Sequence, residues 1–154
     1  MGEKKLLDKS VINLNVKAKD SDDLLMQMSD VLEKAGYVKN SFKEAIIERE
    51  KTFATGLPTD FRGIAIPHTS TEHVNQPIVS IATLDQPVAF KMMGNHDETI
   101  QVDIIFMLAL KEAHAQLEML QNLMSLIQDQ DLLGQARNAE TTDELMDLLG
   151  SYFE

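Results

Sequence analysis

The sequence of 154 residues contains no cysteine and no tryptophan. The lack of cysteine excludes disulfides, thiolate metal ligands and cysteine nucleophiles. No window approaches the roughly 18 consecutive apolar residues that a membrane span needs. The opening segment, MGEKKLLDKS, also lacks the apolar stretch and the small-residue cleavage site of a secretory signal. We therefore expect a cytoplasmic protein.

Basic residues are also scarce. The chain has 14 lysines and arginines against 25 aspartates and glutamates, which gives a formal net charge of −11. Such a surface repels nucleic acid phosphates, so we expect no nucleic acid partner. It favours a basic protein partner, although solubility alone explains the charge equally well. A hydrophobic fraction of 44% suffices for a folded core, and we expect one domain over residues 1–154.

Strand-like and helix-like patterns alternate along the chain. Short alternating or wholly apolar runs predict strands over 11–16, 64–66, 77–84, 88–92 and 102–110. Helical spacing of apolar residues predicts helices over 21–35, 41–53, 113–128, 131–136 and 142–149. Ser41 and Thr141 each precede a glutamate by three residues, which predicts two capping boxes. We expect an α/β fold with a mixed sheet of about five strands flanked by helices on both faces.

Apolar residues in two of these helices indicate the faces that pack on the sheet. Over 113–128 they are Leu117, Leu120, Met124 and Ile127. In the helix that begins at Ser41, Arg49 falls on the apolar stripe that ends at Phe53. A charge on a buried stripe needs an anionic partner or a wet pocket. Arg49 is thus predicted either to bind an anion or to pair with an acid such as Glu48, Glu50 or Asp103.

Four histidines are present, and the positions of two are informative. His68 directly follows the predicted strand in GIAIPH, and His114 follows the strand over 102–110 after three residues. In open α/β sheets, ligands bind at the carboxyl ends of the strands. If these two strands are parallel neighbours, both imidazoles reach the same crevice. The sequence alone does not show that they are.

Three kinds of chemistry could use two such imidazoles. A serine hydrolase is disfavoured because no G-x-S-x-G motif occurs. A metal-dependent hydrolase using His68, His73 and His114 remains an alternative, although no H-E-x-x-H motif is present. The third is phosphoryl transfer through a phosphohistidine, because neutral imidazole is a good nucleophile near pH 7. Such a site needs a hydrogen bond to the second ring nitrogen and donors for the phosphate oxygens.

The residues of this chain suit the third reading best. We expect His68 to be the nucleophile, His114 to donate to the phosphate and Arg49 to neutralise its charge. Thr55 and Gly56 would offer a hydroxyl and an open backbone to the phosphate. The position of His73, five residues after His68, makes it a possible supporting residue. We expect no metal and no cofactor.

Three segments, EREKTFATG, RGIAIPHT and VDIIFMLALKEAHAQLEMLQNLM, resemble the enzyme IIA domains of the fructose–mannitol class. These domains belong to the phosphoenolpyruvate-dependent sugar phosphotransferase system, and the resemblance spans about residues 22–149. It implies that His68 is the phosphorylated residue and that His114 and Arg49 are the family's second histidine and arginine. The stretch PHTSTEHV is most similar to galactitol-type members.

The resemblance also implies a function. His68 would accept a phosphoryl group from phospho-HPr and pass it to a cysteine of enzyme IIB, for uptake of galactitol or a related polyol or sugar. The protein would thus be a phosphotransferase component that meets the membrane enzyme IIC only indirectly. The alternative is a regulatory IIA-like protein whose phosphorylation state controls partner binding. We favour the transport role because the sequence has no basic helix-turn-helix segment.

Overall fold

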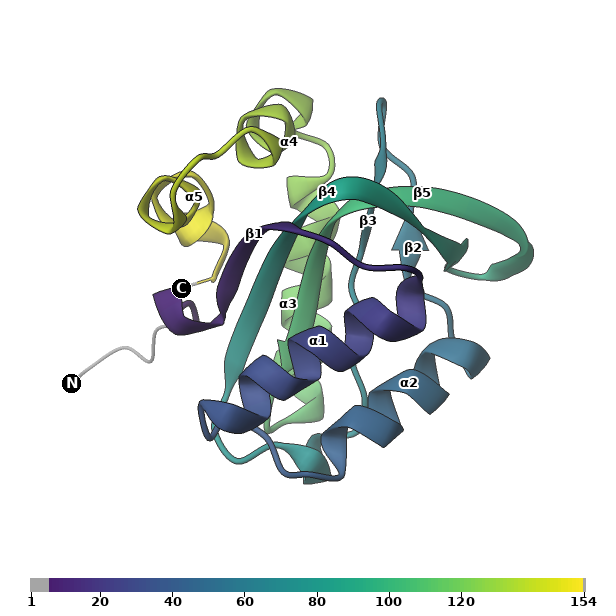
Figure 1. Ribbon diagram of the computed structural model, residues 1–154, viewed down its shortest axis with the longest axis vertical. Coiled ribbons are helices and arrows are strands. Elements are labelled where there is room, and N and C mark those ends of the chain that lie inside the picture. The colour runs from purple at the N-terminus through teal and green to yellow at the C-terminus, as the bar shows by residue number, and fades with distance from the viewer. Residues whose placement is uncertain (1–5, 154) are drawn as a thin grey trace.

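A mixed five-stranded sheet lies between two layers of helices (Figure 1). The computed structural model describes residues 6–153. The strands are β1 (Ile12–Val16), β2 (Gly56–Leu57), β3 (Gly63–Ala65), β4 (Ile78–Met92) and β5 (Asn95–Ala109). The helices are α1 (Ser21–Lys34), α2 (Phe42–Thr52), α3 (Ala113–Leu126), α4 (Gln130–Arg137) and α5 (Thr142–Leu149), with short 3₁₀ turns at Lys9–Val11, Thr71–His73 and Gly150–Phe153. The predicted fold class is confirmed. No helix in this described part of the chain is long and apolar enough to cross a membrane.

The sheet order brings the end of β3 beside the end of β5. β4 is parallel to β1 and antiparallel to β5, while β3 is parallel to β5 and antiparallel to β2. β2 also meets the far end of β4, where Gly56 pairs with Met92. A Cβ atom at Gly56 would lie 2.6 Å from the backbone oxygen of Lys91, so this close approach requires glycine.

The central hairpin differs from the sequence prediction. The runs 77–84 and 88–92 form the single strand β4, and β5 begins at Asn95, before the predicted start at residue 102. Only Met93 and Gly94 turn the chain, and Gly94 has a φ of 77°. Backbone pairing continues past a register shift between Thr83 and Val88. Beyond this irregularity the hairpin still contributes Val88 and Phe90 to the core, whereas most β5 residues before Val102 are exposed.

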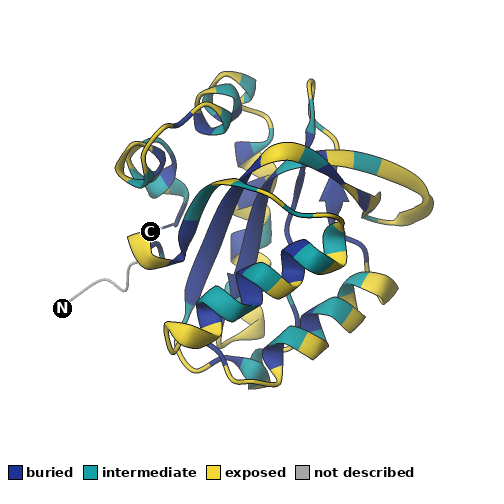
Figure 2. Ribbon diagram, in the orientation of Figure 1, coloured by how far each residue is buried: buried dark blue, intermediate teal, exposed yellow. Residues whose placement is uncertain are grey.

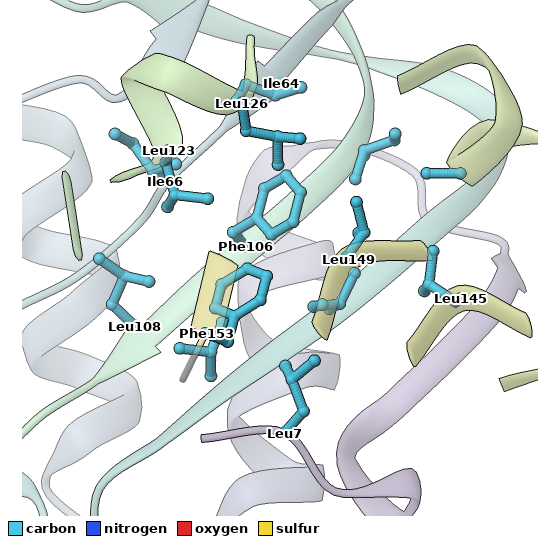
Figure 3. Close-up of a cluster of buried hydrophobic side chains, with 14 of the residues drawn as sticks. Leu7, Ile64, Ile66, Phe106, Leu108, Leu123, Leu126, Leu145, Leu149 and Phe153 are labelled. Carbon is cyan, nitrogen blue, oxygen red and sulfur yellow. The ribbon is translucent and has the colours of Figure 1, made fainter. Parts of the chain in front are cut away.

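The sheet is buried on both faces, as the dark central strands of Figure 2 show. Successive β5 residues face opposite sides: Ile104, Phe106 and Leu108 pack with α3 and α5, whereas Val102, Ile105 and Met107 pack with α1 and α2. The rings of Phe106 and Phe153 stack with centroids 5.9 Å apart, close to Leu149 (Figure 3). This stack fastens the C-terminal turn to the sheet.

A buried ion pair holds the loop between β2 and β3. Arg137 of α4 donates to Asp103 of β5 at 2.9 Å, and their side chains are only 11% and 13% exposed. Arg137 also donates to the backbone oxygen of Arg62 at 3.1 Å and to the hydroxyl of Thr59 at 3.0 Å. The loop that precedes β3 is therefore fixed to the same strand that β3 pairs with.

The capping bond predicted at Thr141 is confirmed: Thr141 accepts a hydrogen bond from the Glu144 N–H at 3.1 Å. At the other end of a helix, Gly36 follows α1 with a φ of 87°. The capping box at Ser41 is wrong. Ser41 already has helical backbone angles, so its side chain makes no capping bond, and its hydroxyl lies 2.7 Å from Nδ1 of His73.

The predicted inner face of α3 is only partly right. Leu120 and Ile127 pack against the core, but Leu117 and Met124 are exposed. The buried residues of the helix are Met119, Leu123 and Leu126. The helix carries apolar side chains on more than one face, so spacing did not select the face that packs.

The buried and exposed faces of α3 allow a test of which residues stabilise the core. We expect Leu123→Ala to lower the free energy of unfolding by about 2–5 kcal/mol, because it leaves a cavity. Leu117 lies on the same helix with 54% exposure, so Leu117→Ala is the matched control. It should change stability by no more than about 0.5 kcal/mol. Urea unfolding followed by circular dichroism measures both, and equal losses would contradict the assigned face.

Candidate functional site

His68 follows β3 and is fixed to β5 by its backbone. His68 forms a parallel bridge with Leu108, and the carbonyl of Pro67 accepts a hydrogen bond from the Leu108 N–H at 3.0 Å. The ring of Pro67 restricts the backbone directly before His68. β3 and β5 are thus parallel neighbours, and His68 lies where their carboxyl ends meet.

The His68 ring has one nitrogen engaged and one left for chemistry. Nδ1 lies 2.9 Å from the carbonyl oxygen of Ile66. A carbonyl can only accept, so Nδ1 carries the proton and Nε2 keeps its lone pair. Burial lowers the pKa of His68, the positive charge of Arg49 lowers it further, and the bond to Ile66 acts in the opposite direction. The ring is therefore neutral and nucleophilic at pH 7.

His114 lies at the same end of the sheet, in the first turn of α3. Its side chain is 80% exposed, and its Nε2 is 3.5 Å from a carboxylate oxygen of Glu118. Two residues further on, the amide of Gln116 donates to the carbonyl of Thr69 at 2.8 Å. This bond ties the start of α3 to the residue after His68. The two histidines predicted from sequence thus share one edge of the fold.

Arg49 is near the site but not on a buried stripe. It is exposed, and its guanidinium carbon lies 4.3 Å above the ring centre of Phe53, which is itself 57% exposed. α2 ends at Thr52 and Phe53 has extended backbone angles, so its ring leaves the helical stripe. The suggested partner Asp103 pairs with Arg137 instead. The charge of Arg49 is therefore available to His68.

Glu50 is the site residue that the sequence analysis missed. Its Oε2 accepts the Thr55 N–H at 2.7 Å and its Oε1 accepts the Thr55 hydroxyl at 2.8 Å. Burial raises the pKa of Glu50 to about 7, against the lowering effect of the two bonds from Thr55. Glu50 falls four residues after the buried Ile46, a spacing that places a carboxylate on the inner face of α2. That signal was present in the sequence.

The structure gives Thr55, Gly56 and His73 different surroundings from those expected. Both hydrogen-bond donors of Thr55 go to Glu50, so neither is free for a phosphate oxygen. Gly56 lies within the sheet, where it allows β2 to approach β4, and does not present open backbone. The ring of His73 lies against the Ser41 hydroxyl at the start of α2. Within residues 6–153, no three His, Asp or Glu side chains are grouped to hold a metal ion, so the three-histidine alternative is not assembled.

Comparison with known proteins agrees with this fold and identifies the family. The chain matches the family described as phosphoenolpyruvate-dependent sugar phosphotransferase system, EIIA 2, over residues 5–152. It belongs to that family, which confirms the resemblance.

The relatives in this family differ in sugar. The chain is 30% identical to the fructose-specific EIIABC component of Bacillus subtilis over 151 residues, which cover 96% of the chain and 23% of that protein. It is 25% identical to the galactitol-specific EIIA component of Escherichia coli, over 74% of the chain and 75% of that protein. A chain in the solved complex of Escherichia coli enzyme IIAMTL with phosphorylated enzyme IIBMTL has the same fold, with a TM-score of 0.77 and 22% identity. The match covers 95% of this protein and 99% of that chain. The galactitol resemblance therefore stays a prediction.

The buried carboxyl of Glu50 predicts a specific pH dependence of stability. Its pKa rises from 4.5 to about 7 in the folded protein. Between these values the folded state holds a proton that the unfolded state has lost, so stability falls as pH rises. Above pH 7 the loss is complete and amounts to about 3 kcal/mol. The difference in unfolding free energy between wild type and Glu50→Gln should change by this amount from pH 4 to pH 8.

The adjacent Glu48 provides the control for this measurement. Its side chain is 76% exposed and lies 3.8 Å from Lys51. Urea unfolding at a series of pH values should give a nearly flat difference between wild type and Glu48→Gln, because an exposed ion pair contributes little. A flat difference for Glu50→Gln would mean that Glu50 is not buried as described.

Proposed function

We propose that this protein carries a phosphoryl group on Nε2 of His68, between the phosphocarrier HPr and an enzyme IIB. One observation carries the proposal: the bond from Nδ1 to the Ile66 carbonyl leaves Nε2 as the nucleophilic nitrogen. Family membership supports it, because the family is part of the sugar phosphotransferase system. We propose a cytoplasmic location on the same ground.

The proposed step is a transfer between two histidines. The Nε2 lone pair attacks the phosphorus of the HPr phosphohistidine, and a new P–N bond forms as the donor's P–N bond breaks. The donor imidazole leaves with the electron pair of the broken bond. The His68 ring gains positive character while its Nδ1–H remains bonded to Ile66, which stabilises the product because the acceptor is already in place.

Arg49 provides positive charge and His114 provides a hydrogen-bond donor for the three phosphoryl oxygens. Arg49 acts on the His68 ring electrostatically, and His114 is exposed at the same edge. A positive charge and a donor at the point where negative charge develops lower the barrier to transfer. Thr55 takes no direct part, because its donors are held by Glu50.

The acceptor in the second step is a cysteine of enzyme IIB. This chain supplies no thiol of its own, and the solved mannitol complex pairs an enzyme IIA of the same fold with a phosphorylated enzyme IIB. The net charge of −11 suits a donor or acceptor with a basic docking face. Galactitol or a related polyol is the proposed sugar, on the resemblance of PHTSTEHV, and transport assays with the neighbouring enzyme IIB and IIC genes would identify it.

The carrier role is tested by intact mass after incubation with enzyme I, HPr and phosphoenolpyruvate. We expect one added phosphoryl group that is stable in base and lost in acid. His68→Ala should abolish it, and His114→Ala should retain it but slow transfer to enzyme IIB. His96→Ala is the control, because His96 is exposed on the hairpin and contacts only the Thr52 carbonyl, at 3.1 Å. A label that persists in the His68→Ala protein would overturn the assignment.

The proposed role of Arg49 predicts that its removal changes both the pKa of His68 and the rate of phosphoryl transfer. Arg49→Gln removes a positive charge that lowers the pKa of His68, so that pKa should rise. Phosphoryl transfer should slow on the order of 100-fold, as when one fixed donor is removed from an active site. Lys51→Gln removes the same charge from an exposed position on the same helix and serves as the control. Nuclear magnetic resonance titration and rapid-quench kinetics measure the two effects, and equal effects from both variants would argue against a specific role.

A further inference from the structure

A chain of hydrogen bonds connects the buried carboxyl of Glu50 to the ring of His68. Glu50 accepts both donors of Thr55, at 2.7 and 2.8 Å. The carbonyl of Thr55 accepts the Ile66 N–H at 3.3 Å. The carbonyl of Ile66 accepts Nδ1–H of His68 at 2.9 Å. Three segments distant in sequence, α2, the start of β2 and the end of β3, thus meet behind the imidazole.

We propose that Glu50 is a positioning residue for His68, which acts through Thr55 and Ile66 to keep the ring in the orientation and tautomer that leave Nε2 free. For its transfer step this inference rests on the proposed function. Glu50 does not touch the phosphoryl group. Through Thr55, Glu50 determines the direction of the Ile66 carbonyl. That carbonyl in turn determines the orientation and the tautomer of the His68 ring.

The surroundings of Thr55 explain why the carboxyl is needed. Thr55 is 2% exposed, so its N–H and hydroxyl have no solvent to bond with. A carboxylate can accept both donors at once on its two oxygens, which a single hydroxyl or carbonyl oxygen in the same place would not do with this geometry. Because Glu50 holds Thr55 in place, the Thr55 carbonyl points at the Ile66 N–H. This bond lies next to the pairing of Gly56 with Ala65, where β2 meets β3.

The Ile66 carbonyl is then restrained on both sides. The bond from the Ile66 N–H to Thr55 fixes the residue on one side. On the other side Pro67 limits the backbone, and its own carbonyl is bonded to β5. If Thr55 moves, the Ile66 peptide loses its anchor while Pro67 stays in place. The distance and angle from Ile66 to Nδ1 then change, and the preference for the Nδ1–H tautomer weakens.

No ion pair with a neighbouring side chain accounts for the position of the Glu50 carboxyl. Burial raises the pKa of Glu50 and the two bonds from Thr55 lower it, and no charged neighbour contributes to the shift. Arg49, on the same helix, is exposed and lies over Phe53. His96 contacts the end of α2 through the Thr52 carbonyl. The connection from Glu50 to His68 is therefore through hydrogen bonds rather than through an ion pair.

Four variants separate positioning from simple stability. Thr55→Ser retains both bonds to Glu50 and is the matched control. Thr55→Val retains the N–H bond and the volume but lacks the hydroxyl bond. Glu50→Gln keeps the shape with a single acceptor oxygen, and Glu50→Leu removes both acceptors. Circular dichroism and thermal melting establish that each protein is folded before the other measurements are made.

The first measurement needs no phosphoryl donor. The ¹⁵N chemical shifts of the His68 ring, taken at pH 8 on the unphosphorylated protein, report which nitrogen carries the proton. Wild type and Thr55→Ser should show a protonated Nδ1 and a bare Nε2. Thr55→Val and Glu50→Leu should show averaged shifts from a mixture of tautomers, with the larger change in Glu50→Leu. Glu50→Gln should fall between wild type and Glu50→Leu.

The second measurement is the rate of phosphoryl transfer from phospho-HPr. We expect wild-type rates for Thr55→Ser, a loss of about tenfold for Thr55→Val and a loss on the order of 100-fold for Glu50→Leu, as for other small misplacements of a reacting group. A purely structural role for Glu50 would lower the melting temperature but leave the tautomer and the rate of the folded protein unchanged. That result would overturn the proposal.

The two measurements also separate this proposal from the carrier function. If wild type accepts no phosphoryl group while the His68 tautomer still depends on Glu50 and Thr55, the carrier function fails and the positioning role stands. If wild type is phosphorylated and the ring shifts are the same in all four variants, the positioning role fails alone. Should Glu50→Leu not fold, the comparison of Thr55→Val with Thr55→Ser decides the question.

Discussion

The hydrogen bond from Nδ1 of His68 to the Ile66 carbonyl is the interaction on which the proposed chemistry of this protein depends. An imidazole free to rotate offers either nitrogen, in either tautomer, to an incoming group. Here the donor and acceptor are two residues apart, 2.9 Å from each other, with a proline between them. The ring therefore presents one unprotonated nitrogen, and its pKa is lowered by burial and by the charge of Arg49, so it stays neutral.

The surrounding fold serves to keep that short loop still. The segment Ile66–His68 is bonded on one side to Thr55 and on the other to Leu108 of β5. β5 is the central strand, with side chains packed into the clusters on both faces of the sheet. The buried pair of Asp103 and Arg137 fixes the preceding loop to the same strand.

The site contains one buried and one exposed ionisable side chain from the same helix. Glu50 is buried, with its pKa raised to about 7, whereas the neighbouring Arg49 is exposed beside Phe53. Adjacent residues on a helix point about 100° apart, so one helix can deliver a carboxyl behind the histidine and a guanidinium to its outer side. The helix α2 thus contributes both to the interior support of the site and to its surface charge.

The sequence by itself determined most elements of the fold and indicated the candidate site residues His68 and His114. Alternating and helical periodicities are local properties, and they predicted the helices and most strand boundaries. The IAIPH and VDIIFMLAL segments predicted His68 and His114 at strand ends, because a strand that stops at a polar residue is visible in the chain. What the sequence did not decide was which surface each side chain faces. The apolar residues of α3 fit two faces, and only the packing of Leu123 and Leu126 against β5 selected one. Thr55, Gly56 and Glu50 likewise received their roles from contacts across the fold, since a hydrogen-bond partner is chosen by distance in space and burial rather than by spacing along the chain.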